Sequence, residues 1–451
     1  MPDLFADAAT AADLVAARMQ MAISLGWHII IACFGVGMPA LTVFAEWRGH
    51  RTGDDAYVQL AHRWAKAMGV LFAVGAVSGT ILSFEMGLLW PALMASYGQV
   101  LGLPFALEGI AFFIEAIFLG IYLYGWDRLP RGVHVLTGLP VCVAGVASAF
   151  FVVAVNAWMN HPRGFDLVNG QVTHVRPWKA LFNPGMPLQT LHMILAAFMV
   201  TGFTVASVYA AGMLRGRRER YHRLGLLVPF VVAAVITPVQ IFVGDNLARF
   251  LATQQPPKLA AIEGLSHTRS HVPLSIGGLY VDGRMRYAVR IPDGLSLLVG
   301  YRPGTVVRGL DTVPPADRPL VNPVHLSFDA MVGIGFGLLL LAVWFALAWR
   351  SHRSLPRSRW FLRFTALSGV ASVIALEAGW VTTELGRQPW VVWQHQRTAE
   401  AVNPAPGLWV GLLIVLAVYA VLTLTTAYVL NRMRTRSAGA PQEGLPEVRT
   451  S

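Results

Sequence analysis

Glu377 and Glu384 lie inside an apolar stretch, residues 373–390, that reads V-I-A-L-E-A-G-W-V-T-T-E-L-G-R-Q-P-W. A spacing of seven residues is two helical turns, so both carboxylates are expected on one face of a helix. A carboxylate at membrane depth costs about 2.5 to 3.5 kcal/mol on insertion scales, so it usually has a partner or a function. Gly379 and Trp380 would let a flat cofactor approach Glu377 closely. The stretch therefore predicts a buried site.

The end of the same stretch has a second interpretation. Gly386 suits a helix C-cap, Pro389 blocks continuation of the helix, and Arg387 and Trp390 are left at the membrane interface. An ordinary helix end with an anchoring tryptophan and arginine would account for these residues without any cofactor.

Other polar residues inside apolar runs are few, and nearly all are expected in the outer half of the bilayer. Two acids of one run stand seven residues apart, and they predict either a neutral hydrogen-bonded pair or a proton relay. A histidine and a methionine at equal depth are an axial set for a low-spin haem, although either alone would equally be an interhelical partner or a packing residue. These residues are His28, Glu85, Glu108 and Glu115 (the acid pair), and His192 and Met331.

Composition gives the class of protein. The chain has 451 residues, 55% hydrophobic and 13% charged, with a mean hydropathy of +0.54, which is typical of a polytopic membrane protein. Cys33 and Cys142 lie in apolar runs, so any metal must be held by His, Met or carboxylate. The net charge of +11 does not indicate nucleic-acid binding, because the basic residues form short clusters between spans. The mildly acidic start of the chain lacks the features of a cleavable signal, so the first span is expected to direct insertion.

Hydropathy predicts an all-α protein with nine transmembrane helices. Arginine clusters follow the odd-numbered spans, which places the N-terminus outside (periplasmic) and the C-terminus in the cytoplasm. His62 and His134 lie near these clusters and are expected to face solvent or headgroups. The uncharged stretch from Pro91 to Pro104 is expected to be a short link. The spans run over 20–45, 64–90, 104–126, 133–156, 188–213, 225–245, 326–349, 360–384 and 407–431.

The longest outer segment, 246–323, alternates like a strand near Leu279 to Ile291 and is expected to be a folded cap. Lys258 and Glu263 in this segment predict either an ordinary surface ion pair or, beside a cofactor, a site that binds and deprotonates a phenolic or quinol-type substrate. The expected division of the chain is 1–245 (helices one to six), 246–323 (cap), 324–432 (helices seven to nine) and 433–451 (a disordered cytoplasmic tail).

Four motifs together carry a family resemblance over almost the whole chain. They are F-A-L-E-G-I-A-F-F-I-E-A (105–116), V-N-A-W-M-N-H-P (155–162), K-L-A-A-I-E (258–263), and L-E-A-G-W followed by G-R-Q-P-W (376–390). The chain resembles subunit I of cytochrome bd-type quinol oxidases. F-E-M-G-L-L-W-P (84–91), Asp329 and the short cap are similar to the cyanide-insensitive branch.

The resemblance implies a set of haem and substrate residues. His192 and Met331 would ligate a low-spin haem b. His28 and Glu377 would ligate the two high-spin haems, b and d (or a further haem b in place of d), and which residue holds which haem stays open. The remaining roles would be a proton supply and catalytic lining at Glu108 and Glu115, contact with haem at Trp380 and Arg387, and quinol binding at Lys258, Glu263 and Asp245.

The resemblance also implies a function in the bacterial inner membrane. Quinol, with ubiquinol expected, would be oxidised at the periplasmic face and O2 reduced to water, generating a proton motive force without a pump. The implied partners are subunit II, a small single-helix subunit and membrane lipid. Two alternative functions agree less well with the sequence. An ion-coupled transporter would need broken helices in matched halves, which the sequence lacks. A non-catalytic cytochrome b conduit would leave His28, Glu377 and the paired acids unexplained.

Overall fold

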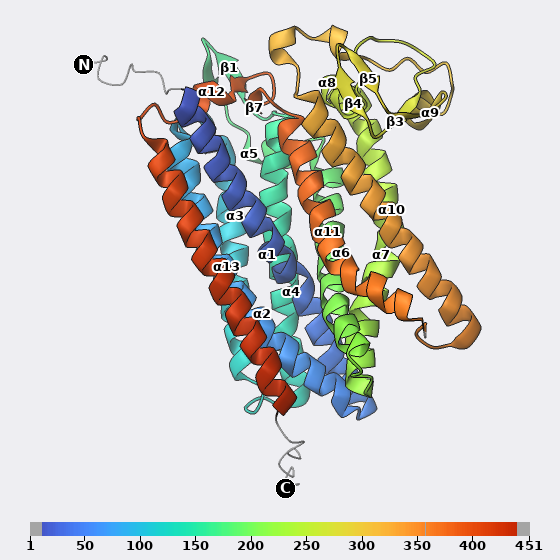
Figure 1. Ribbon diagram of the computed structural model, residues 1–451. Coiled ribbons are helices and arrows are strands. Elements are labelled where there is room, and N and C mark those ends of the chain that lie inside the picture. The colour runs from blue at the N-terminus through green and yellow to red at the C-terminus, as the bar shows by residue number, and fades with distance from the viewer. Residues whose placement is uncertain (1–10, 357, 440–451) are drawn as a thin grey trace.

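The computed structural model describes residues 11–356 and 358–439. Within them, nine helices are long and apolar enough to cross a membrane, as the sequence predicts. The end at which α1 begins also carries the strands and short helices, and α13 ends on the opposite side (Figure 1). The nine are α1 (Ala11–Thr52), α2 (Asp55–Leu89), α3 (Pro91–Tyr124), α4 (Arg131–Asn160), α6 (Met186–Leu214), α7 (Arg220–Gln254), α10 (Val321–His352), α11 (Arg359–Leu385) and α13 (Leu408–Gly439).

Three predicted boundaries are wrong. The expected link 91–104 is the first part of α3, because Pro91 at the first helical position needs no N–H partner and starts the helix. The cap begins nine residues later than expected, since α7 continues to Gln254 instead of ending at residue 245. Residues 433–439 of the expected disordered tail continue α13, and 440–451 lie outside the described residues.

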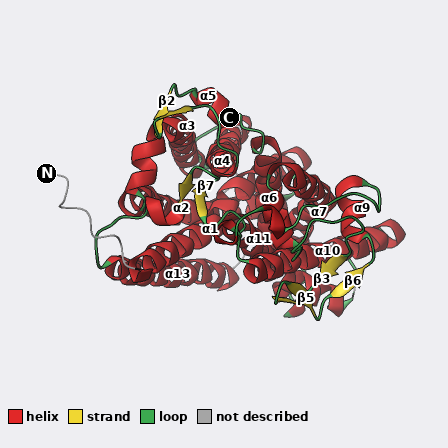
Figure 2. Ribbon diagram, turned by 90° about the horizontal axis from the view of Figure 1, so that it is seen from above, coloured by secondary structure: helices red, strands yellow, loops and turns green. Residues whose placement is uncertain are grey.

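Eight of the long helices form two four-membered rings. In the first, α1 packs on α2 and α4, and α3 closes the ring; in the second, α6 packs on α7 and α11, and α10 closes it. The rings meet where α6 contacts α1 and α4 and where α11 contacts α1, while α13 packs on α1 and α2. Figure 2 shows the two groups from above. Bundles of this kind build cofactor sites in their cores from side chains on facing helices.

The cap is folded, and the predicted strand-like alternation is confirmed. Strand β3 (Leu274–Ile276) pairs with β6 (Val289–Ile291), and β4 (Leu279–Val281) pairs with β5 (Arg284–Arg286), all antiparallel. Two short helices, α8 (Pro256–Ile262) and α9 (Gly294–Gly300), flank the strands.

Helix α10 fastens the cap to the membrane part. The side chain of His325 is fully buried, with Nδ1 2.6 Å from the carbonyl oxygen of Ile262 and Nε2 3.0 Å from that of Gly277. The Gly277 N–H donates to Asp329 at 2.5 Å. The cap therefore has a fixed position over the helix that carries Met331.

Two smaller outer segments complete the same end. The segment between α4 and α6 holds β1 (Asp166–Val168), β2 (Gln171–Thr173) and α5 (Pro177–Leu181). The segment between α11 and α13 holds β7 (Trp390–Val392), β8 (Gln396–Arg397) and α12 (Thr398–Ala401).

At the opposite end of the molecule, the prediction that His134 faces solvent or headgroups is wrong. His62 is exposed, as expected, but His134 is buried, with Nδ1 2.6 Å from Glu46 Oε1 and Nε2 2.8 Å from the Tyr122 carbonyl oxygen. The Tyr122 hydroxyl donates to the other Glu46 oxygen at 2.5 Å. Glu46 has no exposed surface, and a buried carboxylate requires such partners, which draws His134 inward.

Candidate functional site

Glu377 on α11 lies where the two rings of helices meet. A Cβ built on Gly26 of α1 would stand 3.0 Å from Glu377 Oε2 and 3.9 Å from the ring of Trp380, so the missing side chain leaves room for both. Glu377 Oε1 is buried and has no hydrogen-bond partner among the described residues. Buried carboxylate oxygens normally have partners, so this atom is available to a bound group.

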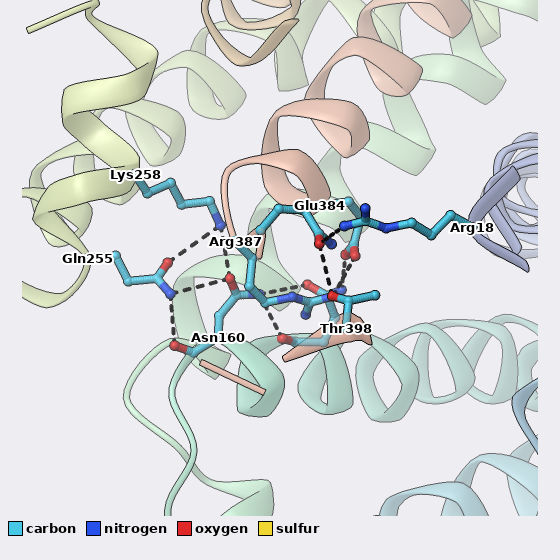
Figure 3. Close-up of polar contacts among 9 residues, drawn as sticks. Arg18, Asn160, Gln255, Lys258, Glu384, Arg387 and Thr398 are labelled. Atoms are coloured by element: carbon cyan, nitrogen blue, oxygen red, sulfur yellow. Dashed lines mark hydrogen bonds and ion pairs between the residues drawn. The ribbon is translucent and has the colours of Figure 1, made fainter. Parts of the chain in front are cut away.

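Both carboxylate oxygens of Glu384, two turns along the same helix, have hydrogen-bond partners. Its Oε1 accepts a hydrogen bond from Asn156 Nδ2 at 2.5 Å, and its Oε2 accepts one from Arg387 Nη2 at 2.5 Å (Figure 3). Arg387 is 3% exposed, and its Nε and Nη1 have no partner within the part of the chain that is described. The guanidinium therefore has N–H groups free for an anion, such as a carboxylate of a cofactor.

His28 on α1 is held in a form suited to metal binding. Its Nδ1 lies 2.8 Å from Ser78 Oγ of α2, and that hydroxyl donates its proton to the Gly75 carbonyl at 3.0 Å. The serine oxygen must then accept from an Nδ1–H, which leaves the Nε2 lone pair free. The ring also lies against Gly79, where a Cβ would be 3.2 Å from Cε1. Such an outer partner commonly orients a ligating histidine.

His192 and Met331 come from α6 and α10, the diagonal members of the second ring. His192 Nδ1 is buried without a partner among the described residues, and its Nε2 lies 3.2 Å from Gln240 Nε2. A Cβ on Gly379 of α11 would stand 2.7 Å from Met331 Sδ, so the sulfur occupies space that only glycine leaves open.

Glu108 and Glu115 share one face of α3, as predicted. Glu115 is buried, and its Oε1 lies near two glycines of neighbouring helices, 3.7 Å from a Cβ position on Gly35 and 3.5 Å from one on Gly145. Glu108 is half-buried. The two acids therefore lie on one face of α3, and Glu115 lies against α1 and α4 of the first ring.

Lys258 is buried, which excludes the interpretation as a surface ion pair. It is 3% exposed, and its Nζ donates to Asn160 Oδ1 at 2.9 Å. Burial, with the charge of Arg387, lowers the pKa of Lys258 from its usual 10.5 to about 7. Its stem crosses Gly386, where a Cβ would be 2.8 Å from Cε. The glycine of G-R-Q-P-W thus makes room for the lysine of K-L-A-A-I-E.

Glu263 is also buried, but it lies close to Asp329 of α10 and not at the end of α11. It is 8% exposed, and burial, with the charge of Asp329 on α10, raises its pKa to about 8. Helix α8 therefore directs Lys258 toward the end of α11 and places Glu263 close to α10. Asp245 lies apart from this arrangement, within α7, in a 2.6 Å ion pair with Arg249.

Sequence reasoning missed the polar residues that support these groups. Asn156 and Asn160, inside the V-N-A-W-M-N-H-P motif, contact Glu384 and Lys258, and their four-residue spacing in the last turns of a span was a usable signal. Ser78 gave no signal, because a lone serine in an apolar run is common.

The residues present fit haem. They offer two histidines, a methionine thioether, carboxylates and an arginine with free N–H groups, and glycines stand where a Cβ would obstruct several of them. Buried nitrogen and oxygen atoms without partners are the feature expected of a cofactor pocket.

The comparisons with known proteins agree. The sequence model of the family described as "Cytochrome bd terminal oxidase subunit I" matches residues 16–438. The chain belongs to this family. As a member of it, the protein is a multi-pass membrane subunit of a haem-containing quinol oxidase, and the resemblance drawn from the four motifs is confirmed.

Named relatives cover nearly the whole chain. A putative cytochrome bd menaquinol oxidase subunit I of Bacillus subtilis (strain 168) is 39% identical over 425 residues, 93% of this chain and 96% of that protein. Cytochrome bd-II ubiquinol oxidase subunit 1 of Escherichia coli (strain K12) is 26% identical, over 95% of this chain and 98% of that protein. The solved structure of a bd oxidase from Geobacillus thermodenitrificans is 39% identical, with a TM-score of 0.89 over 94% of this chain and 98% of that one.

Proposed function

We propose that this subunit binds quinol between the cap and the ends of α10 and α11 and reduces O2 to water inside the membrane. The observation that carries the proposal is the burial of Lys258 and Glu263, 3% and 8% exposed, at the junction of α8 with those two helices. Two opposite ionisable groups out of water suit a substrate that offers a hydroxyl proton.

Four residues are proposed as haem ligands. His192 and Met331 would hold a low-spin haem b, and His28 with Glu377 would hold the two high-spin haems, b and d or a further b. When bound, the haems would carry electrons from quinol to dioxygen. Trp380 would pack against a macrocycle, and the free N–H groups of Arg387 would bind a haem carboxylate.

Glu384 is a second candidate for the acidic ligand. Asn156 and Arg387 fix its orientation, and ligating carboxylates are typically held by such partners. Glu377 is favoured for a different reason, because its Oε1 has no partner among the described residues and is free to bind a metal. Glu377 is therefore the proposed ligand, and variants of both carboxylates distinguish it from Glu384.

The chain's own residues would handle the protons. Lys258 in its charged form would donate a hydrogen bond to a quinol oxygen, and Glu263 in its ionised form would accept the proton that quinol loses. That proton would leave on the cap side. Glu108 and Glu115 would carry protons along α3 for water formation. Separate release and uptake on the two sides would generate a proton motive force without a pump, with the cap side periplasmic.

Substrate and partners follow the same proposal. Ubiquinol remains the expected donor, although the relatives include one named for menaquinol and one named for ubiquinol. The complex would contain subunit II and a small single-helix subunit. Asp245, paired with Arg249 in α7, is kept as an outlying contact for the substrate.

The test is haem content and oxygen uptake of purified wild type, Glu377→Gln and Glu384→Gln. Each substitution is nearly isosteric and removes the charge, so folding is expected to survive. Wild type should show a Soret band, bind carbon monoxide when reduced by dithionite, and take up oxygen with quinol. Glu377→Gln should keep the low-spin spectrum and lose high-spin haem and uptake, with a milder effect in Glu384→Gln.

Other outcomes reject parts of the proposal. If Glu384→Gln loses more high-spin haem and oxygen uptake than Glu377→Gln, Glu384 is the ligand instead. Wild type that holds haem but binds no carbon monoxide would be an electron conduit, and wild type without a Soret band would be a transporter.

A further inference from the structure

The last turn of α4 connects the proposed quinol site to α11. Lys258 Nζ donates to Asn160 Oδ1 at 2.9 Å, and Asn160 Nδ2 donates to Asn156 Oδ1 at 3.2 Å. Asn156 Nδ2 then donates to Glu384 Oε1 at 2.5 Å, and Arg387 donates to the other oxygen of the same carboxylate. Figure 3 labels the two ends of this row, Lys258 with Asn160 and Glu384 with Arg387.

The row is buried at its centre. Asn160 has no exposed surface, and its two polar side-chain atoms both have partners. Gln255, also without exposed surface, donates from Nε2 to the Asn160 carbonyl oxygen at 2.9 Å. Buried networks of this kind fix one geometry, because any displaced member leaves a partner unsatisfied.

Helix capping alone does not explain the two asparagines. Asn160 Nδ2 does contact its own helix, at the Asn156 carbonyl oxygen, 2.9 Å away. Its Oδ1, however, faces Lys258 of α8, and Asn156 Nδ2 faces Glu384 of α11. A capping residue satisfies only its own backbone, whereas these amides span three elements.

Further hydrogen bonds hold the turn at the Arg387 end of the row. Arg18 of α1 donates to Gln388 Oε1, and Thr398 Oγ1 donates to the same oxygen at 2.9 Å. Gln388 follows Arg387 directly, so the turn after α11 is held from α1 and α12. A displacement of Lys258 is therefore not absorbed by movement of the Arg387 turn.

We propose that Asn160 and Asn156 are positioning residues for quinol oxidation: Asn160 fixes the Lys258 ammonium that binds the quinol oxygen, and Asn156 holds that site in register with the Glu384–Arg387 pair. The inference rests on the proposed function and deepens it by naming what sets the position of the donor relative to α11.

The first test is Asn160→Leu, which keeps the approximate volume and removes both hydrogen-bonding groups. The KM for a short-chain quinol should rise about tenfold or more, the loss expected for a hydrogen bond to a charged group. The kcat at saturating quinol and the haem spectrum should change little. Asn160→Asp keeps an acceptor oxygen for Lys258 and should return the KM to within about threefold of wild type.

Asn156→Leu should act on the other half of the row. Oxygen uptake with quinol should fall at saturation, and the high-spin haem bands should shift, because Glu384 loses one of its two partners. Asn183→Leu is the matched control. Asn183 is 2% exposed, donates to the Ala154 carbonyl oxygen at 3.3 Å and accepts from the N–H groups of Gly185 and Met186 at the start of α6, but it does not contact Lys258 or Glu384. It should lower thermal stability and leave the KM unchanged.

The outcomes separate the inference from the proposed function. Wild type without quinol-dependent oxygen uptake would reject the proposed function itself. An active wild type with an unchanged KM in Asn160→Leu, or an Asn183→Leu variant with the same KM rise, would overturn the inference and leave the asparagines as structural residues.

Discussion

The pH dependence of quinol binding tests Lys258 most directly. Burial with the charge of Arg387 lowers its pKa to about 7, so its charge changes within the range in which the oxidase can be assayed. If the ammonium binds quinol, only the protonated form is competent. The protonated fraction is about 0.9 at pH 6 and about 0.1 at pH 8 for a pKa of 7. The KM for quinol should therefore rise about tenfold over this interval, since a quinol itself stays neutral there.

Two variants make the assignment specific. Lys258→Met removes the charge and should give a KM that is about 10- to 100-fold higher, the loss of one charge-assisted hydrogen bond, and independent of pH. Lys179→Met removes the same charge from an exposed position on α5 and should retain the wild-type profile.

The measurement is the initial rate of oxygen uptake against quinol concentration at pH 6, 7 and 8. Glu263 also titrates in this range, with a pKa raised to about 8, so Glu263→Gln should be measured beside wild type. Glu263 is protonated below that value and can accept a proton only above it, so its loss should change kcat and leave the slope of KM intact. A flat wild-type KM, or an unaltered slope in Lys258→Met, would refute the reasoning.

Three further expectations concern the haem pocket and the cap. Met331→Leu keeps the volume and removes the sulfur, so folding should survive at a cost under about 1.5 kcal/mol while the reduced low-spin α-band is lost; an unchanged band in a reduced-minus-oxidised spectrum would contradict the ligand role. Gly386→Ala places a Cβ 2.6 Å from the Thr382 carbonyl oxygen and 2.8 Å from Lys258 Cε, so it should lower thermal stability and raise the KM for quinol without loss of haem, whereas Gly98→Ala, with nothing within 4 Å, should be neutral in the same assay. His325→Ala leaves two carbonyl oxygens of the cap unpaired, costs about 1 to 3 kcal/mol and should speed tryptic cleavage of the cap; equal cleavage rates would show that other contacts hold it.

The candidate site was predictable from sequence only as a set of positions. His28, His192, Glu377 and the acids of α3 were identifiable because a polar group in an apolar run is costly whatever it contacts. Lys258 was identifiable as a residue but not as a buried one, since loop sequences are normally exposed and only the fold places α8 against α11. The wrong expectation for His134 has the same origin, because burial of Glu46 is a property of the packed helices.

The sequence by itself determined the class of protein, the nine spans and the motifs of the family, because hydropathy and short motifs are local properties of the chain. Local rules were weakest where two structures satisfy the same pattern, as at Pro91, which can begin either a link or a helix. The tertiary structure alone decided which polar groups meet. Asn156 and Glu384 are 228 residues apart, and their hydrogen bond depends on how α4 and α11 pack, which no local pattern encodes.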